Sequence, residues 1–173
     1  MGSLANIGKI TTVVLDVDGV LTDGRIGYST GPNEVKFFHV QDGQRMKLAM
    51  RSGLRIGILS GRGSEANRTR CAELGLSFVM ENFKNKLDGW NALLQEQHVT
   101  PEECLYVGDD LVDLPPMRRC GIAVAVANAC PEVKAAADWV TPRRGGEGAV
   151  ADVMEFLLKG QGKWEEALKR YYL

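Results

Sequence analysis

The sequence contains no apolar run of the roughly eighteen residues that a membrane-spanning helix requires. Its first nine residues, MGSLANIGK, lack the basic segment and the long apolar segment of a secretory signal peptide. We therefore expect no membrane partner and a cytoplasmic location. We expect residues 1–9 to be a disordered segment or a tag.

Side chains that bind soft metal ions are scarce. The chain has two histidines, His39 and His98, and four cysteines without a Cys-x-x-Cys pair. Neither histidine has the spacing to a cysteine that is typical of a zinc site. We expect reduced, structural cysteines at Cys71, Cys104, Cys120 and Cys130.

Charge of one sign is not in excess. The chain carries 21 lysine and arginine residues against 22 aspartate and glutamate residues, for a formal net charge of −1. No local run of lysine and arginine is long enough to indicate a nucleic-acid site. We therefore expect no nucleic-acid partner.

Short apolar runs alternate with stretches of helical period, which predicts a three-layer, Rossmann-like α/β fold with a parallel sheet. Buried strands are predicted at 11–16, 55–60, 104–109 and 121–126, with weaker candidates at 77–80 and 138–141. Helices are predicted at 43–52, 64–74, 84–97, 131–137, 147–158 and 163–171. At 173 residues the chain is expected to form a single domain, 1–173, that ends in a tail helix within 160–173.

One segment breaks the alternation of strands and helices. Residues 25–40 alternate loosely in polarity and contain a Gly-Pro-Asn turn, which predicts a β-hairpin inserted after the first strand. The insert is too short to form a separate cap domain.

Acidic residues follow two of the predicted strands. LDVDGVLTDG (15–24) follows the first strand, and GDDLVD (108–113) ends a later one. Because the carboxyl ends of parallel strands meet at one edge of a sheet, we expect a shared site there. The side chains that would converge on it are Asp16, Ser60, Asp109 and Asp113.

Several oxygen ligands without a nearby histidine or cysteine favour a hard cation, Mg²⁺ above all. Without a cation, clustered carboxylates repel one another and raise each other's pKa values. A plainer interpretation is that these aspartates are turn and helix-cap residues. Two acidic clusters, each after an apolar strand, favour the metal site.

Four segments, in order and spacing, resemble the motifs of the haloacid-dehalogenase-like phosphatases. They are DVDGVLTDG (16–24), LSGR (59–62), a lysine within NFKNKLDGW (82–90) and GDDLVDLP (108–115). The resemblance covers about residues 10–155 and implies a Mg²⁺-dependent phosphatase.

The resemblance also implies a role for individual residues. Asp16 would be the nucleophile that forms an aspartyl phosphate, and Asp18 would serve as general acid and then general base. Ser60 and Gly61 would hold phosphoryl oxygens, and Lys86, preferred over the nearby Lys84, would neutralise charge in the transition state. The implied ligands of Mg²⁺ are Asp16, Asp18 through its carbonyl, Asp109 and Asp113.

The segments FFHVQDG (37–43), VANACPEVKAAADWVT (126–141) and RRGGEGAV (143–150) extend this resemblance to the 3-deoxy-D-manno-octulosonate 8-phosphate (Kdo 8-phosphate) phosphatases of lipopolysaccharide synthesis. It implies a sugar-acid phosphate substrate whose carboxylate Arg62 binds, with Arg70 as a second candidate or a solvated helix residue. It also implies a homotetramer in which a neighbour's C-terminal segment completes the active site.

Two other functions stay open. One is hydrolysis of a nine-carbon, sialic-acid-type 9-phosphate, or broad hydrolysis of small phosphate esters. Arg62 favours the eight-carbon branch, because the nine-carbon branch is known for an acidic residue there. The other is a non-catalytic assembly module of the kind linked to cytidylyltransferases, which the complete set of motif residues argues against. DGQRMK (42–47) departs from the family pattern at Arg45 and Met46, which we expect to lie beside the substrate pocket.

Overall fold

The structure, a computed structural model, describes residues 4–30 and 34–173. Its centre is a six-stranded sheet in which every neighbouring pair is parallel. Across the sheet the strands are β5 (Phe78–Met80), β4 (Arg55–Leu59), β1 (Thr12–Leu15), β6 (Cys104–Gly108), β7 (Ile122–Ala125) and β8 (Trp139–Val140). All six predicted strands, including the two weaker candidates, are therefore confirmed.

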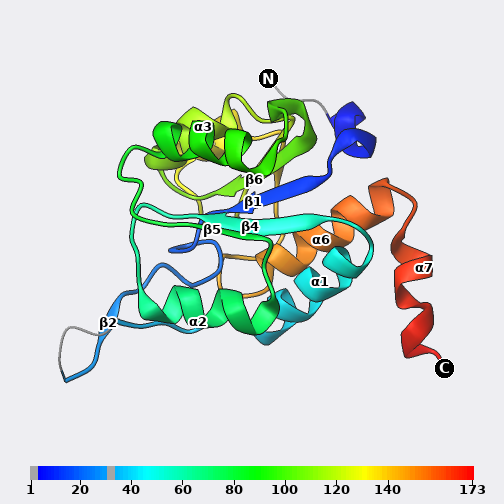
Figure 1. Cartoon of the computed structure of the whole chain (residues 1–173), viewed down its shortest axis with the longest axis horizontal. Coiled ribbons are helices and arrows are strands. Elements are labelled where there is room, and N and C mark those ends of the chain that lie inside the picture. Colours follow the sequence, from blue (N-terminus) through cyan, green and yellow to red (C-terminus); the bar gives the residue numbers. More distant parts are fainter. Residues whose placement is uncertain (1–3, 31–33) are drawn as a thin grey trace.

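Helices cover both faces of the sheet, so the fold has the three layers that the sequence predicts (Figure 1). The helices α1 (Val40–Arg51), α2 (Glu65–Leu74) and α6 (Ala149–Gly160) lie on one side, and α3 (Lys86–Gln97) lies on the other. The short helices α4 (Leu114–Met117) and α5 (Pro131–Ala136) contact β7 and each other. Burial on both sides explains why the strands are continuous apolar runs, as in β1, where all four residues are buried.

Local sequence signals set the helix ends. The side chain of Ser64 caps α2 by accepting a hydrogen bond from the Asn67 N–H, and Gly75 ends the helix in the left-handed conformation. Pro131 occupies the first turn of α5. Helix α1 begins at Val40, three residues before the predicted start. The prediction was late because no capping side chain marks the N-terminus of this helix.

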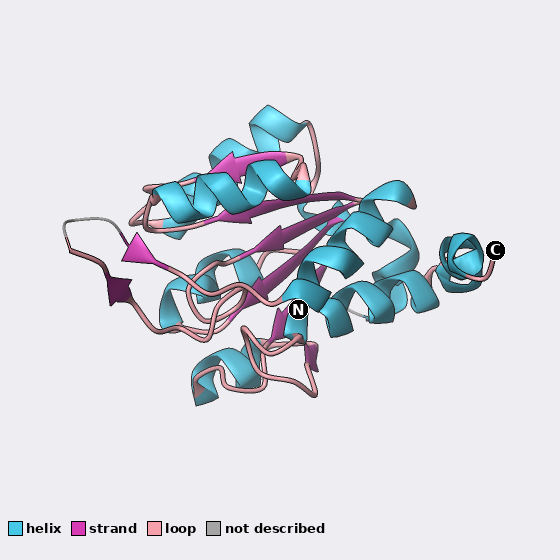
Figure 2. Ribbon diagram, turned by 90° about the horizontal axis from the view of Figure 1, so that it is seen from below, coloured by secondary structure: helices cyan, strands magenta, loops and turns pink. Residues whose placement is uncertain are grey.

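The inserted segment forms an antiparallel pair of short strands, β2 (Gly27–Tyr28) and β3 (Glu34–Val35), which projects away from the main sheet (Figure 2). The predicted Gly-Pro-Asn turn, residues 31–33, lies outside the described residues. Large apolar side chains on and after this pair are exposed, and they include Tyr28, Phe37 and Val40.

Both ends of the described chain are helical. Of residues 1–9, which were expected to be a disordered segment or a tag, Leu4–Lys9 form a 3-10 helix and residues 1–3 lie outside the described residues. The tail, expected as one helix, comprises α7 (Trp164–Leu168) and a 3-10 turn, Lys169–Tyr171. Within the described parts of the chain, none of the helices has the length and apolar character that a bilayer span would need.

The tail packs against α1 of its own chain. The guanidinium of Arg45 lies over the Trp164 ring, 5.5 Å from the ring centre, and the Gln44 amide donates to the Tyr171 hydroxyl at 3.0 Å. Met46 is buried in the core. The expectation that Arg45 and Met46 lie beside the substrate pocket is therefore wrong, because α1 turns one toward the tail and the other into the core.

Candidate active site

The site lies at the central strand β1, where successive strands are added to opposite sides of the sheet. Strand β1 sits between β4 and β6, so the residues that follow these three strands meet at one edge. They surround a cavity of about 420 Å³. Its walls are formed by Asp16, Asp18, Gly24, Ser60, Gly61, Arg62, Lys84, Lys86, Asp109, Asp110 and Val112.

The centre of the site is a buried lysine between two carboxylates. The Lys86 ammonium lies 2.6 Å from Oδ1 of Asp16 and 2.6 Å from Oδ1 of Asp113. Its side chain is only 2% exposed, whereas Lys84 is exposed on the cavity wall. Lys86 is the first residue of α3, and the Asn85 side chain caps that helix. The start of the helix therefore holds the lysine beside the two carboxylates.

The Asp113 carboxylate has hydrogen-bond donors on both oxygens. Oδ1 accepts from Lys86 and from the Tyr106 hydroxyl at 2.8 Å, while Oδ2 accepts from the backbone N–H groups of Asp109 and Asp110 at 2.9 and 3.2 Å. A fully buried carboxylate with four donors is a fixed part of the structure. Asp113 is therefore placed to orient Lys86 and the Asp109 loop.

The acidic cluster meets the geometric needs of a hard cation. Carboxylate oxygens of Asp16, Asp109 and Asp113 lie within 4.8 Å of one another. The buried Oδ1 of Asp109 has no hydrogen-bond partner among the described residues. A buried oxygen without a partner is costly unless a ligand or ion meets it, and an all-oxygen set suits Mg²⁺.

The close packing of these buried charged groups also shifts their pKa values. Burial raises the pKa of Asp16 to about 6, although the positive charge of Lys86 opposes the shift. Burial and the negative charges of Asp16 and Asp113 raise the pKa of Asp109 to about 8. Burial acts to lower the pKa of Lys86, but Asp16 and Asp113 outweigh it, so the ammonium stays charged.

The loop after β1 is shaped by close backbone packing. Gly19 has a φ of 103°, and a Cβ there would overlap the Asp109 carboxylate. The Thr22 hydroxyl accepts from the N–H groups of Gly19 and Gly24, at 3.3 and 3.2 Å, which closes the turn. The turn therefore needs a glycine at position 19, which leaves room for the Asp109 carboxylate.

The glycine-rich segment near the C-terminus packs on this loop. A Cβ at Gly145 would overlap the carbonyl oxygen of Gly19, and the Gly146 N–H donates to the Val20 carbonyl at 3.1 Å. Arg143 holds the segment through its ion pair with Asp152, 2.6 Å between nitrogen and oxygen. RRGGEGAV is thus part of the wall behind the nucleophile loop of its own chain.

The residues after β4 form the other wall. Ser60 is 2% exposed, and its hydroxyl oxygen accepts from the Arg62 N–H at 3.2 Å. The Arg62 side chain is half exposed and forms an ion pair with Glu34 from the inserted hairpin. Glu34 raises the pKa of that guanidinium further, mainly through the hydrogen bond between them.

The hairpin also contributes Lys36, which the sequence analysis missed. Its ammonium lies 2.6 Å from Oδ1 of Asp18 and 3.6 Å from Oε2 of Glu34, and its side chain is fully buried. No motif marks this lysine, because its position depends on how the hairpin folds back over the site. The one clue to it in the sequence is that it is a charged residue within the inserted segment.

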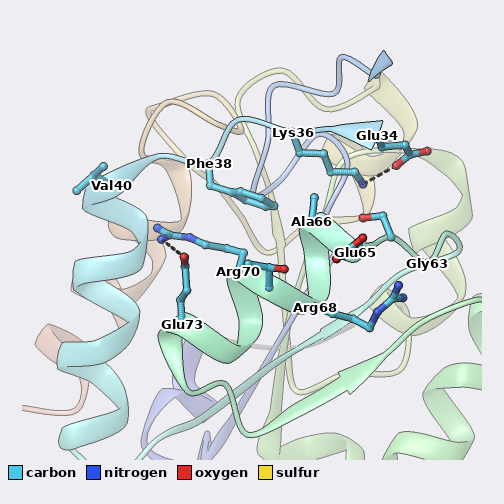
Figure 3. A pocket seen from close by; sticks show the side chains of 12 residues that line it. Glu34, Lys36, Phe38, Val40, Gly63, Glu65, Ala66, Arg68, Arg70 and Glu73 are labelled. Carbon is cyan, nitrogen blue, oxygen red and sulfur yellow. Dashed lines mark hydrogen bonds and ion pairs between the residues drawn. The ribbon is translucent and has the colours of Figure 1, made fainter. Parts of the chain in front are cut away.

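Arg70 is the predicted site residue that the structure does not bring to the carboxylates. It lines a neighbouring cavity of about 740 Å³ between the hairpin and α2 (Figure 3). There its guanidinium pairs with Glu73 at 3.3 Å and lies over the Phe38 ring at 5.8 Å. Glu34 and Lys36 line this cavity too, and they contact Arg62 and Asp18 of the active-site cavity.

Comparison with known proteins extends these observations. A family model for haloacid dehalogenase-like hydrolases matches residues 71–154. The chain is 42% identical to the 3-deoxy-D-manno-octulosonate 8-phosphate phosphatase of Escherichia coli K12, over 95% of this chain and 87% of the relative. It is 41% identical to the same enzyme of Haemophilus influenzae, over 90% of this chain and 86% of that protein.

Two solved structures share the fold closely. One is the 3-deoxy-D-manno-octulosonate 8-phosphate phosphatase of Moraxella catarrhalis with a magnesium ion, a phosphate ion and Kdo, at 34% identity and a TM-score of 0.93. That match covers 97% of each chain. The other is the cobalt-bound phosphatase of H. influenzae, at 39% identity, 91% and 92% coverage and a TM-score of 0.88.

Proposed function

This chain belongs to the family of 3-deoxy-D-manno-octulosonate 8-phosphate phosphatases, and we propose that it hydrolyses Kdo 8-phosphate to Kdo and inorganic phosphate. The observation that carries the proposal is the contact of Lys86 with both Asp16 and Asp113 at the end of the central strand. A cation fixed beside a buried carboxylate suits transfer of an anionic phosphoryl group to that carboxylate.

In the first half of the reaction, a carboxylate oxygen of Asp16 attacks phosphorus and the bond to the sugar oxygen breaks. Asp18, two residues along the turn, donates its proton to the leaving sugar oxygen. The product is free Kdo and an aspartyl phosphate on Asp16. Lys86 balances part of the negative charge that gathers on the phosphoryl oxygens.

In the second half, Asp18 takes a proton from a water molecule, whose oxygen attacks the same phosphorus. The bond between phosphorus and Asp16 breaks, which releases phosphate and restores the carboxylate. The Ser60 hydroxyl and the Gly61 N–H hold phosphoryl oxygens through both steps. The acid and the base are thus the same side chain in successive protonation states.

Mg²⁺ is the cofactor that the acidic cluster fits, and when bound it would shield the carboxylate nucleophile from the negative charge of the phosphate. We propose Asp16, the Asp18 carbonyl and Asp109 as its protein ligands. Asp113, whose oxygens already accept four hydrogen bonds, would act by holding the Asp109 loop.

Arg62 is the proposed partner of the substrate carboxylate. Its guanidinium reaches the cavity from the residues after β4 and is half exposed, so a substrate carboxylate that displaces Glu34 can meet it in a bidentate contact. Arg70 lines the neighbouring cavity instead and pairs there with Glu73, so we do not propose it as a direct contact.

A homotetramer is the proposed assembly. The exposed apolar side chains Tyr28, Phe37 and Val40 favour burial of the hairpin against other copies of this chain. Light scattering should give four times the mass of the 18.9 kDa chain. A monomer that is fully active would contradict both the assembly and the idea that a neighbour completes the site.

The test of function is phosphate release from a panel of phosphate esters with Mg²⁺, beside the Asp16→Asn variant. The panel contains Kdo 8-phosphate, nine-carbon sugar-acid 9-phosphates and hexose phosphates. Preference for Kdo 8-phosphate, with no turnover by the variant, is the expected result. Preference for a nine-carbon acid would support the proposed mechanism and contradict the proposed substrate. No phosphate release from any ester would overturn the whole proposal.

A further inference from the structure

We propose that Lys36 is a positioning residue for Asp18, so that the inserted hairpin supplies part of the acid–base machinery. This inference rests on the role proposed for Asp18. The Lys36 ammonium lies 2.6 Å from Oδ1 of Asp18, although 18 residues and a change of direction separate them in the chain. The contact is as short as those that Lys86 makes at the centre of the site.

The burial of Lys36 argues against an ordinary surface ion pair. The Lys36 side chain has no exposed surface, and that of Asp18 is 20% exposed. A lysine ammonium is strongly hydrated, so complete burial is retained only where other groups replace the lost water. Here Asp18 provides a hydrogen bond, and Glu34 provides a second negative charge at 3.6 Å.

Glu34 is the second acidic residue that contacts Lys36. Glu34, two residues earlier, also holds Arg62 from the opposite wall of the site. The other oxygen of Glu34 is buried and faces Lys36 without accepting a hydrogen bond from the described residues. The charges therefore alternate along Asp18, Lys36, Glu34 and Arg62, which ties the hairpin to both walls (Figure 3 shows Lys36 and Glu34).

This arrangement has a chemical consequence. Because the ammonium engages Oδ1 of Asp18, the carboxyl group is fixed in rotation and Oδ2 is the oxygen left to carry the proton. Asp18 needs one orientation in both half-reactions, first toward the leaving oxygen and then toward the attacking water. Without Lys36 the carboxyl would rotate freely on a partly exposed loop, and misplaced acid–base groups lose rate.

The first test compares Lys36→Met with Lys36→Arg. Methionine keeps much of the length of the lysine and removes its charge, so kcat for a sugar-acid phosphate should fall by about 10- to 100-fold with little change in KM. Arginine should restore part of the loss. Lys9→Met, at an exposed position before the amino end of β1, is the control and should match the wild type.

The second test uses p-nitrophenyl phosphate, whose leaving group needs no protonation. Lys36→Met should form the aspartyl phosphate normally and then release phosphate slowly, which gives a burst of one equivalent of nitrophenolate. Asp18→Asn should give the same burst. Combining Lys36→Met with Asp18→Asn should cost no more than Asp18→Asn alone, because both act on one step.

Three results would overturn the proposal: a loss confined to KM, equal losses on both substrates without a burst, or losses that add in the double variant. Thermal melting of each variant separates these from misfolding, and Lys36→Arg provides a folded comparison. If the wild type hydrolyses p-nitrophenyl phosphate but no sugar-acid phosphate, the substrate proposal fails. The Lys36 test can then still be read from the burst.

Discussion

The ammonium of Lys86 lies 2.6 Å from the Asp16 carboxylate, below the carboxyl end of the central strand. Lys86→Met should lower kcat by at least about 100-fold, because the transition state loses its fixed positive charge. Phosphate release under saturating substrate measures this effect. Lys84→Met, which removes an exposed lysine two residues away, should lose far less, and equal losses would contradict the assignment.

Asp113→Asn should destabilise the protein by about 2–4 kcal/mol, because the amide NH2 would face donors in either orientation, the two backbone N–H groups or Lys86 and Tyr106. Urea unfolding measures the change, and Mg²⁺ titration should show weaker binding as the Asp109 loop loosens. The control is Asp110→Asn, since asparagine can cap the following turn as aspartate does. A stable Asp113→Asn protein would show that the four hydrogen bonds are unimportant.

Removal of Mg²⁺ should make stability depend on the ionisation of Asp109. Burial and the negative charges of Asp16 and Asp113 raise its pKa in the folded chain from 3.8 to about 8, so the folded state binds the proton more tightly. Relative to Asp109→Asn, the metal-free wild type should lose stability as pH rises from 3.8 toward about 8. Thermal melts in a chelator across this range measure the difference.

Saturating Mg²⁺ should reverse that loss in the wild type, because the ion binds the ionised carboxylate of the folded chain. It should stabilise Asp109→Asn much less. If the two proteins respond equally to Mg²⁺ at pH 8, Asp109 is not a ligand.

Gly145→Ala should destabilise the protein by about 1–3 kcal/mol and reduce kcat, because the new methyl group would push against the Gly19 carbonyl. Unfolding and turnover measured on the same sample test both effects. Gly8→Ala is the control, since among the described residues no atom outside its immediate chain neighbours lies within 4 Å of the added Cβ. A fully active Gly145→Ala protein would mean that the loop shifts without disturbing Asp16 and Asp18.

Arg45→Gln should lower the melting temperature slightly, because the guanidinium leaves the Trp164 ring. It should not change the ratio of kcat/KM between eight- and nine-carbon substrates, since Arg45 faces the tail. Arg62→Gln should change that ratio strongly. A change in specificity in Arg45→Gln would contradict this placement and show that α1 contributes to the substrate pocket.

The sheet could be predicted from the sequence because buried parallel strands consist of continuous apolar runs. The sequence also placed Asp16, Ser60 and Asp109 at one edge, since parallel strands end together. The orientation of α1 could not be predicted in the same way. Arg45 and Met46 lie in its second turn, and a difference of three residues in the helix start changes the direction of every side chain.

Contacts of the hairpin were also beyond a sequence-based prediction. Lys36 reaches Asp18 only because the antiparallel pair folds back across the site, and no periodic pattern encodes that position. Arg70 shows the reverse case, in which a charged helix residue near the motif is engaged by Glu73 and Phe38 instead. Long-range packing, rather than local propensity, decides both.

The packing of Gly145 and Gly146 on the loop after β1 sets the order in which an active molecule can be made. During translation the nucleophile strand leaves the ribosome early, but its neighbour β6 follows about ninety residues later and the glycine-rich segment later still. A nascent chain that extends past Asp113 but stops before Arg143 therefore carries every proposed catalytic side chain without the segment that packs behind them. Phosphatase activity should begin only when synthesis is nearly complete, so early-terminated chains remain inactive.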